Sequence, residues 1–432
     1  MCMKKKMGMG LMAAAVLALA MLAGCGDQPG REYREVVMWT FGMGIDEWLL
    51  THETDIEKRF NVDMVYELVP QNGFIQKLQA AMYSGENVPD IIEWMIENNR
   101  ILNADPAKCF VLPLDEFVNK SKLWKQVPPG RSSWVTYGGH VYGLPHDVHP
   151  VILIYNDTLW KEAGVDLAEI ETWDEFFAAA LKLIAEKENG KPLHYALPSG
   201  DGGLGDSMWM IWQQTGAHIL DREGRPQFNN FRFKMFLQKW LRWQESGVFT
   251  DWDWGNFGAL LKNGTLCAYT SPDWWVGQVN AAVEDGAYEW RVRELPLYVG
   301  GNGARTSSWG GSFLAIPKTV KDPERIYEII EYIQYGNPEI LVSRYDIGGM
   351  LAPVAGIWDD PVFHQPDPRF GGQKLGELQT RHAMDTPRVN AGDVFWDAVA
   401  DFNEVYPLLA SGELSINEGL ARVQETAEAR LE

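Results

Sequence analysis

The sequence predicts an α/β protein made of two lobes. Short apolar strands alternate with amphipathic helices from residue 36 onward, in the order strand, helix, strand, helix, strand. This order produces a parallel sheet with helices on both faces. The 408 residues that follow the first 24 are also too many for one compact core. We therefore expect two lobes, each with a mainly parallel sheet flanked by helices.

The first elements follow from hydrophobic periodicity. Apolar residues in alternation or in a short run predict strands, and apolar residues at intervals of three or four predict helices. The segments are the strand 36–41, the helix 49–60, the strand 62–68, the helix 74–82 and the strand 91–92. Gly85 follows the second helix, and glycine commonly ends helices.

Later helices carry clear start signals. Thr172 with Glu175 and Ser415 with Glu418 have the spacing of capping boxes, in which the two side chains satisfy backbone N–H groups of the first turn. Asp322 before Pro323 predicts a third helix start. We expect that helix to end at Gly336.

The N-terminus has the form of a secretory signal peptide. Three lysines precede an apolar stretch that is too short to cross a bilayer, and small residues follow it. The ending Leu22-Ala23-Gly24-Cys25 resembles the bacterial lipobox. It implies a signal peptide over residues 1–24, lipidation of Cys25 and a tether over residues 25–32. The alternative is a plain signal peptide with an incidental cysteine.

Charge and cysteine usage limit the function classes. The formal net charge is −21, and it becomes −24 once the three leader lysines are removed. Nucleic acids and anionic membrane surfaces bind basic patches, so neither is an expected partner. Two cysteines, Cys109 and Cys267, remain after the leader, Cys25 being the expected lipidation site. We expect both to be buried and unpaired.

Tryptophan is unusually abundant. The chain has 19 tryptophans, more than its 18 phenylalanines or 15 tyrosines. An indole offers a flat apolar face to a sugar ring, and its N–H can still bond a hydroxyl group. In Ser271-Pro-Asp-Trp-Trp-Val-Gly277, two adjacent indoles must point in different directions. The two therefore cannot do the same job, and if one is displayed to a ligand the other is expected to pack beneath the turn.

No local motif indicates a cofactor, a metal or a catalytic group. Gly42-x-Gly44 is half of a dinucleotide fingerprint, but Glu47 stands where the third glycine belongs. His140, His146 and His149 lack the spacing of a zinc site, and Asp251-Trp-Asp253 lacks the later ligands of a calcium loop. We expect no cofactor, no metal and no enzymatic activity.

Six segments together are similar to the sugar-binding family of extracellular solute-binding proteins of ABC importers, which includes the maltose-binding protein. They are FNVDMVYELVPQNGFIQKLQAAMYSGENVPDIIEW (60–94), GGHVYGLPHDVHPVILIYNDTLWKEAGV (138–165), ETWDEFFAAALKL (171–183), NGTLCAYTSPDWW (263–275), GGSFLAIPKTVKDPERIYEIIEYI (310–333) and LASGELSINEGLARVQE (409–425). They occur in the family's order and span nearly the whole chain after the leader.

The resemblance implies a type II periplasmic-binding-protein-like fold with the ligand cleft at a hinge. The chain is expected to cross between the lobes near residues 147–150, 306–311 and 349–354. The first lobe would comprise approximately residues 33–148 plus 310–350, and the second approximately residues 150–308 plus 352–432.

The resemblance also implies ligand-binding residues. Trp94, Trp274 and Trp396 match positions where the maltose-binding protein presents a tryptophan to sugar. Asp147, His149 and Glu93 are expected polar partners for hydroxyl groups. Trp309 faces either the cleft or the hinge, and Trp209, Trp212, Trp252 and Trp254 could border the site, whereas the helical spacing of Phe236, Trp240 and Trp243 predicts a core stripe.

The resulting hypothesis is a lipid-anchored binding component of an ABC importer on the extracellular face of the membrane. It would capture a carbohydrate, expected to be an oligosaccharide, as a monomer. A permease and a separate ATPase would be its partners. A receptor for a non-sugar solute and a secreted carbohydrate-active hydrolase are the alternatives.

Overall fold

The computed structural model describes residues 34–41, 47–70, 72–101, 106–199, 203–284, 286–392 and 394–431. The expected signal peptide 1–24, the lipidation site Cys25, the tether 25–32 and the Gly42-x-Gly44 turn lie outside these ranges. No helix within the ranges is both long enough and apolar enough to span a bilayer.

The first lobe is organised around a mixed sheet. Within the described residues it has five strands in the order β2-β1-β3-β14-β6. Strand β1 is parallel to β2 and β3, whereas β14 is antiparallel to β3 and β6. The strands are β1 (Arg34–Thr40), β2 (Val62–Leu68), β3 (Ile91–Met95), β6 (Leu144–Pro145) and β14 (Ser312–Ala315). Strand β14 is antiparallel because it enters this lobe from the other one, at the edge where β1 and β3 end.

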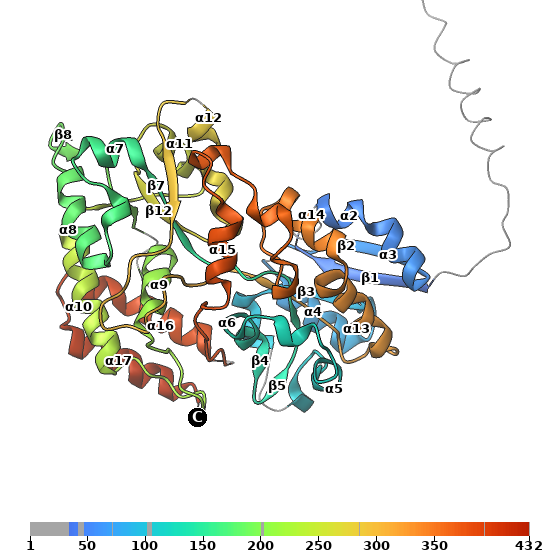
Figure 1. Cartoon of the computed structure of the whole chain (residues 1–432). Coiled ribbons are helices and arrows are strands. Elements are labelled where there is room, and N and C mark those ends of the chain that lie inside the picture. Colours follow the sequence, from blue (N-terminus) through green and yellow to red (C-terminus); the bar gives the residue numbers. More distant parts are fainter. Residues whose placement is uncertain are drawn as a thin grey trace, which may run out of the picture.

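Helices cover both sides of this sheet (Figure 1). They are α2 (Glu47–Thr51), α3 (Glu53–Phe60), α4 (Phe74–Ser84), α5 (Asp115–Val118), α6 (Pro129–Ser132), α13 (Pro323–Glu331) and α14 (Pro338–Gly348). A hairpin of β4 (Thr136–Tyr137) and β5 (His140–Val141) lies beside them. The helix expected over residues 49–60 is divided at His52, whose backbone angles (φ −105°, ψ 3°) leave the helical range.

The second lobe departs from the expected mainly parallel sheet. Its strands β7 (Ile152–Asn156), β12 (Ala268–Ser271) and β13 (Trp290–Arg293) form a sheet in the order β12-β7-β13, and both pairings are antiparallel. The reason is the route of the chain. Strand β7 carries the chain away from the first lobe, and β12 and β13 bring it back. Only a short pair elsewhere in this lobe, β10 (Leu197–Pro198) with β11 (Phe249–Thr250), is parallel among its described strand pairings.

Helices supply most of the second lobe. They are α7 (Asp157–Glu162), α8 (Trp173–Leu183), α9 (Asp206–Trp212), α10 (Phe231–Glu245), α11 (Phe257–Lys262), α12 (Asn280–Glu284), α15 (Leu375–Ala383), α16 (Phe395–Ala410) and α17 (Ile416–Ala429). A short hairpin pairs β8 (Lys187–Glu188) with β9 (Lys191–Pro192). Both predicted capping boxes are confirmed, at α8 and α17. The predicted stripe of α10 is buried, as expected of a core face.

Each lobe is assembled from segments that are far apart in the sequence. Figure 1 shows the blue N-terminal and orange α13–α14 segments in one lobe, and the green, yellow and red segments in the other. The chain leaves the first sheet between β6 and β7 and returns between β13 and β14. These two crossing segments lie side by side, since Val151 N–H donates to Ser307 O and Pro150 forms a bridge with Ser308.

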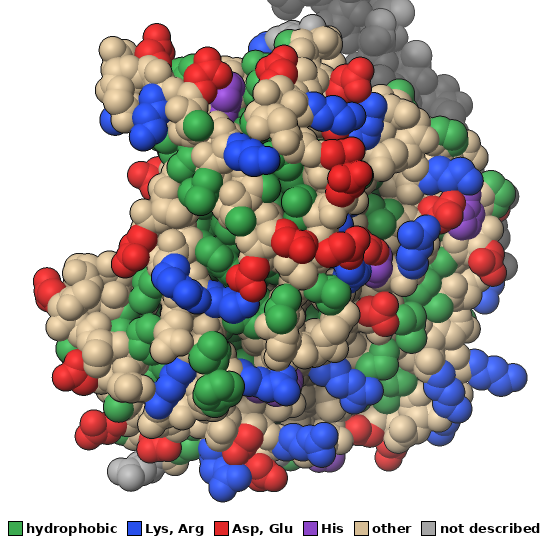
Figure 2. Space-filling model, turned by 60° about the vertical axis from the view of Figure 1, so that its left-hand side comes forward, with side chains coloured by type: hydrophobic (Ala, Val, Ile, Leu, Met, Phe, Trp, Pro, Cys, Tyr) green, Lys and Arg blue, Asp and Glu red, His purple; other side chains and the backbone are tan. Residues whose placement is uncertain are grey.

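The interior agrees with the sequence expectation for the two cysteines. Cys109 and Cys267 are buried and are not joined in a disulfide. Burial raises the pKa of the Cys267 thiol, which keeps it protonated. Lysine and arginine side chains are interspersed with acidic ones over the face shown in Figure 2, with no large patch of one sign.

Candidate functional site

The pocket that holds all three expected polar residues lies where the crossing segments meet. It has a volume of about 270 Å³. Its wall is formed by Phe41, Glu93, Met95, His146, Asp147, His149, Trp274, Gly310, Gly311, Ser312, Gly348 and Met350. These residues come from the ends of β1 and β3, from the segments between the lobes and from the turn after β12. Of the expected site residues, the structure brings Glu93, Asp147, His149 and Trp274 together here.

Trp94 lies elsewhere. Side chains alternate along a strand, so neighbouring residues of β3 face opposite sides of the sheet. Glu93 and Met95 face the pocket, whereas Trp94 is fully buried and packs edge-on against Phe313, with ring centroids 5.7 Å apart. The expectation that both Glu93 and Trp94 contact a ligand conflicts with this alternation. The structure places Trp94 in the core of the first lobe.

Trp274 is held at the pocket wall by two hydrogen bonds. Its backbone N–H donates to Asp273 Oδ1 at 2.8 Å, and its indole N–H donates to Trp309 O at 3.1 Å. A Cβ atom added at Gly310 would lie 3.1 Å from the indole nitrogen. The indole therefore rests on a stretch of backbone that has no side chain, and it remains half-buried.

Trp275 has a different environment from its neighbour. It is 1% exposed, and its ring stacks on Phe257 with centroids 4.7 Å apart. Both residues belong to a short 3₁₀ helix, Asp273–Val279. Consecutive residues of such a helix point about 120° apart, so Trp275 turns toward Phe257 while its ring still stacks on that of Trp274, with centroids 5.9 Å apart. Trp275 thus packs beneath the turn, as the sequence predicts.

Trp309 and Trp396 belong to an aromatic cluster next to the pocket. The ring centroid of Trp209 lies 5.6 Å from that of Trp309 and 5.8 Å from that of Trp396. Trp396 also stacks on Trp134 at 6.2 Å, and its indole N–H donates to Ile96 O at 2.6 Å. Neither Trp309 nor Trp396 lines the pocket described above. Their half-buried rings instead join α16 and α9 to the first lobe.

A chain of buried charges extends from the pocket wall into the interior. Arg131, at 1% exposed, contacts Asp147 Oδ1 and also donates from Nη1 to Gly310 O at 3.0 Å. Asp147 Oδ2 lies 2.6 Å from His146 Nδ1 and 2.8 Å from His149 Nε2. The opposite ring nitrogen of His149, Nδ1, is bonded to Asp273 Oδ1.

These contacts determine the protonation states. Burial by itself would raise the pKa of Asp147, but Arg131, His149 and His146 hold it well below the usual range. Burial by itself would lower the pKa of His149, but Asp147 and Asp273 raise it to about 9. At neutral pH, Asp147 is therefore a carboxylate and His149 an imidazolium.

Glu93 is also engaged within the protein. Its Oε2 accepts a hydrogen bond from Thr40 Oγ1 at 2.5 Å, and its Oε1 accepts one from Ser312 Oγ at 2.8 Å. The two hydroxyl groups orient the carboxylate at the junction of β1, β3 and β14. Glu93 is 1% exposed, so it borders the pocket through a small part of its surface.

Sequence reasoning missed Arg131 and Asp273 as members of this site. Nothing near Arg131 in the sequence distinguishes it. Its partner Asp147 lies 16 positions away, and Gly310 lies 179 positions away. Asp273 stands directly before Trp274, and its position in the quoted turn is the signal that could have identified it.

The remaining tryptophans divide between the pocket rim and other surfaces. Trp254 is 64% exposed, and its ring lies 6.2 Å from that of Trp274 at an angle of 33°. Trp252 packs edge-on against Trp254 at 5.3 Å. Trp254 therefore adjoins Trp274, whereas Trp252 packs against Phe257 and Trp275.

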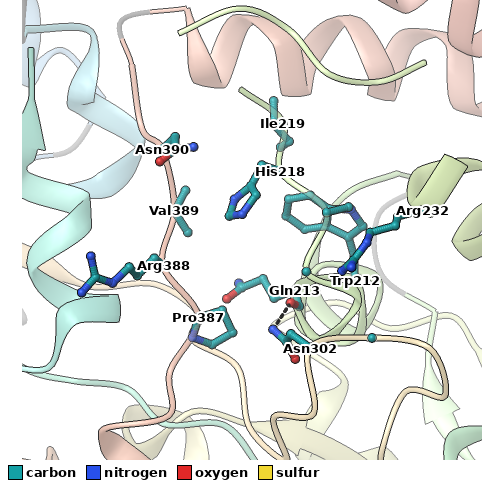
Figure 3. A pocket seen from close by; sticks show the side chains of 13 residues that line it. Trp212, Gln213, His218, Ile219, Arg232, Asn302, Pro387, Arg388, Val389 and Asn390 are labelled. Atoms are coloured by element: carbon teal, nitrogen blue, oxygen red, sulfur yellow. Dashed lines mark hydrogen bonds between the residues drawn. The ribbon is translucent and has the colours of Figure 1, made fainter. Parts of the chain in front are cut away.

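Trp212 lines a separate pocket of about 350 Å³ (Figure 3). The pocket lies between the end of α9, the loop that follows it and residues 387–390. His218 points into it, whereas Arg388 points away. None of the seven expected ligand-binding residues lines this pocket.

No group of three or more potential metal ligands comes together within the described ranges. His140 contacts Asp115, and its ring does not approach His149 in any described contact. His146 and His149 instead share the carboxylate of Asp147.

Two α/β lobes, with a pocket where the chain crosses between them, define a cleft-binding receptor. The model of the bacterial extracellular solute-binding protein family matches residues 46–334. The chain belongs to this family. It is 23% identical over 412 residues to the arabinooligosaccharide-binding protein of Halalkalibacterium halodurans, covering 92% of this chain and 90% of that one.

Two further comparisons agree. The arabinooligosaccharide-binding protein of Bacillus subtilis is 24% identical over 347 residues, with 76% of each chain covered. The solved structure of the sugar-binding protein MalE from Xanthomonas citri superposes with a TM-score of 0.74 at 19% identity, covering 92% of this chain and 97% of that one. The predicted two-lobed fold and the predicted family are thereby confirmed.

Proposed function

We propose that the chain captures an oligosaccharide between its lobes and presents it to the permease of an ABC importer. The observation that carries this proposal is Trp274, a half-buried indole at the wall of a pocket whose lining also includes the polar residues Glu93, Asp147 and His146. An aromatic face beside polar groups is the combination that a sugar ring requires. The names of the two curated relatives support arabino-oligosaccharides as the first ligands to test.

The outer tryptophans support a ligand longer than one sugar. Trp254 continues the aromatic surface beyond Trp274, with the two rings 6.2 Å apart. Successive sugar units can then contact successive indoles. Trp396 and Trp309 stay proposed contacts for an opened state of the cleft, since both lie beside the pocket in this structure.

The proposal includes the expected cellular context. The protein would be secreted, lipidated at Cys25 and held at the extracellular face of the membrane by its tether. The lobe boundaries proposed from the sequence are residues 33–148 with 310–350, and residues 150–308 with 352–432. The receptor would act as a monomer. An ABC permease and a separate ATPase would be its partners.

A ligand screen tests the proposal. The melting temperature is measured with arabinotriose, maltotriose and chitobiose, and with amino acids and polyamines as non-sugar controls. An oligosaccharide at one hundred times its Kd is expected to stabilise the fold by about 2.7 kcal/mol. Stabilisation by a non-sugar solute alone would favour the non-sugar receptor. Chromatography of the recovered sugar tests the hydrolase alternative, because cleavage products would contradict a binding role.

A further inference from the structure

His149 occupies an unusual backbone conformation at the first crossing segment. Its φ angle is +57°, a left-handed conformation that non-glycine residues seldom adopt. The side chain is only 3% exposed. Such a conformation persists when surrounding contacts determine it, and it is often associated with a functional requirement. Here the contacts are the two carboxylates that hold both ring nitrogens.

The buried charges connect all the crossing segments. Arg131, on α6, reaches the second crossing through Gly310 O and the first crossing through Asp147. His149 continues the chain from Asp147 to Asp273. Asp273 Oδ2 then accepts a hydrogen bond from Leu351 N–H at 2.7 Å, in the third crossing segment. One continuous set of polar contacts therefore joins the two lobes and the hinge.

The same contacts extend to the expected stacking residue. Asp273 Oδ1 is bonded to His149 Nδ1 and also accepts the backbone N–H of Trp274. The position of this carboxylate therefore depends on the imidazolium on one side, and the carboxylate bonds the backbone of Trp274 on the other. Both ring nitrogens of His149 are occupied, so neither is available to a ligand hydroxyl.

We propose that His149 is a positioning residue: its imidazolium, held between Asp147 and Asp273, keeps Trp274 in place at the pocket wall and so sets ligand affinity without bonding the ligand. This inference rests on the proposed binding function. It replaces the expected role of His149 as a direct hydroxyl partner. The carboxylate pair keeps the imidazole charged at neutral pH, and loss of that charge removes the attraction to Asp273.

The charged and titratable groups around His149 belong to several elements. Asp147 and Asp273 contact it directly, and Arg131 and His146 lie on the far side of Asp147. Three further groups lie nearby and belong to other elements: Glu93 on β3, and Arg344 and Tyr345 on α14. Burial and Asp273 raise the pKa of Tyr345, so this phenol stays protonated over the range tested.

Fluorine NMR tests the proposal without any sugar. The chain is labelled with 5-fluorotryptophan, and the Trp274 resonance is assigned by its absence in Trp274→Phe. Between about pH 7 and about pH 10 this resonance is expected to shift with a midpoint near 9, the pKa of His149. The resonance of Trp173, which is buried in the second lobe, serves as the control that stays unchanged.

Two variants test whether the shift of the Trp274 resonance comes from the charge on His149. His149→Gln removes the charge and is expected to abolish the shift. Asp273→Asn keeps an oxygen for the Trp274 N–H but removes one carboxylate from His149, so the midpoint is expected to fall toward 6.5. A Trp274 resonance that does not shift in the folded wild type, or that shifts equally in both variants, would overturn the proposal.

A binding measurement separates this inference from the proposed function. Calorimetry with arabinotriose is expected to give about tenfold weaker binding for His149→Gln than for the wild type at pH 7, and no further loss for the variant at pH 9.5. Equal affinities of variant and wild type would contradict positioning. If the wild type does not bind arabinotriose, the proposed ligand is wrong, and the fluorine titration still decides whether His149 positions Trp274.

Discussion

The rings of Trp274 and Trp275 stack on each other with centroids 5.9 Å apart and planes inclined by 22°, yet only Trp274 reaches the pocket. Trp275 lies on the core side of this pair, against Phe257 and Tyr269. The stacked partner therefore supports the displayed ring from behind. The two residues should respond differently to substitution.

Trp275→Ala is expected to reduce the free energy of unfolding by about 3–5 kcal/mol, because it removes a fully buried indole. Trp274→Ala is expected to weaken oligosaccharide binding by at least about 2 kcal/mol, roughly thirtyfold in affinity, with a smaller effect on stability. Urea unfolding and calorimetry measure the two quantities. Equal effects of the two substitutions on both quantities would contradict this division.

Alkaline pH should destabilise the fold through His149. Its pKa is about 9 in the folded protein and 6.5 in an ordinary environment. Because the folded value is raised, the stabilisation is fully present below about pH 6.5 and is lost as the pH rises through about 9. The effect is on the order of 3 kcal/mol. Urea unfolding at several pH values should show this decline in the wild type and a reduced decline in His149→Gln.

Asp147→Asn should be strongly destabilising at neutral pH. The substitution leaves Arg131 and the two histidines in a buried site without their shared carboxylate, and breaking such a pair costs about 3–5 kcal/mol. Asp174→Asn is the matched control, because it removes a partly exposed pair with Lys239 and should cost less than about 1 kcal/mol. Similar costs for the two variants would show that the buried charges do not act as a unit.

The depressed pKa of Asp147 predicts that the fold loses stability at acid pH. The pKa of Asp147 is depressed in the folded state, so its contribution is present above its ordinary pKa of 3.8. This stabilisation declines once the pH falls below 3.8. It is lost when the pH has passed below the pKa that Asp147 has in the folded protein. Acid unfolding followed by circular dichroism should begin at a higher pH once Arg131→Met removes the main stabilising charge. An unchanged acid midpoint would contradict the role given to Arg131.

Gly311→Ala should disrupt the hinge side of the pocket. A Cβ atom at this position would lie 1.5 Å from Arg131 Nη2, and the φ angle of +118° is itself unfavourable for alanine. Gly303→Ala is the control: its φ is +84°, but nothing lies within 4 Å of the added atom. Thermal unfolding should show a much larger loss for Gly311→Ala, because only there must the guanidinium move.

Local features of this protein could be predicted from the sequence with good accuracy. The capping boxes at Thr172 and Ser415 and the helix start at Asp322 depend on residues within one helical turn, and each is present in the structure. The orientation of the second-lobe strands could not be predicted in this way. It depends on where the chain enters and leaves the lobe, which periodicity does not record.

The candidate site also combines features that short-range sequence signals predict with features that depend on long-range packing. The sequence by itself determined most of the elements, the family and the fact that Trp274 and Trp275 must differ, because periodicity, caps and adjacent residues act over short distances along the chain. The tertiary structure alone decided that Trp94 is buried against Phe313 and that His149 bridges Asp147 and Asp273. The partner of His149 in the second lobe lies 124 positions away, and only the packing of the crossing segments brings the two side chains into contact.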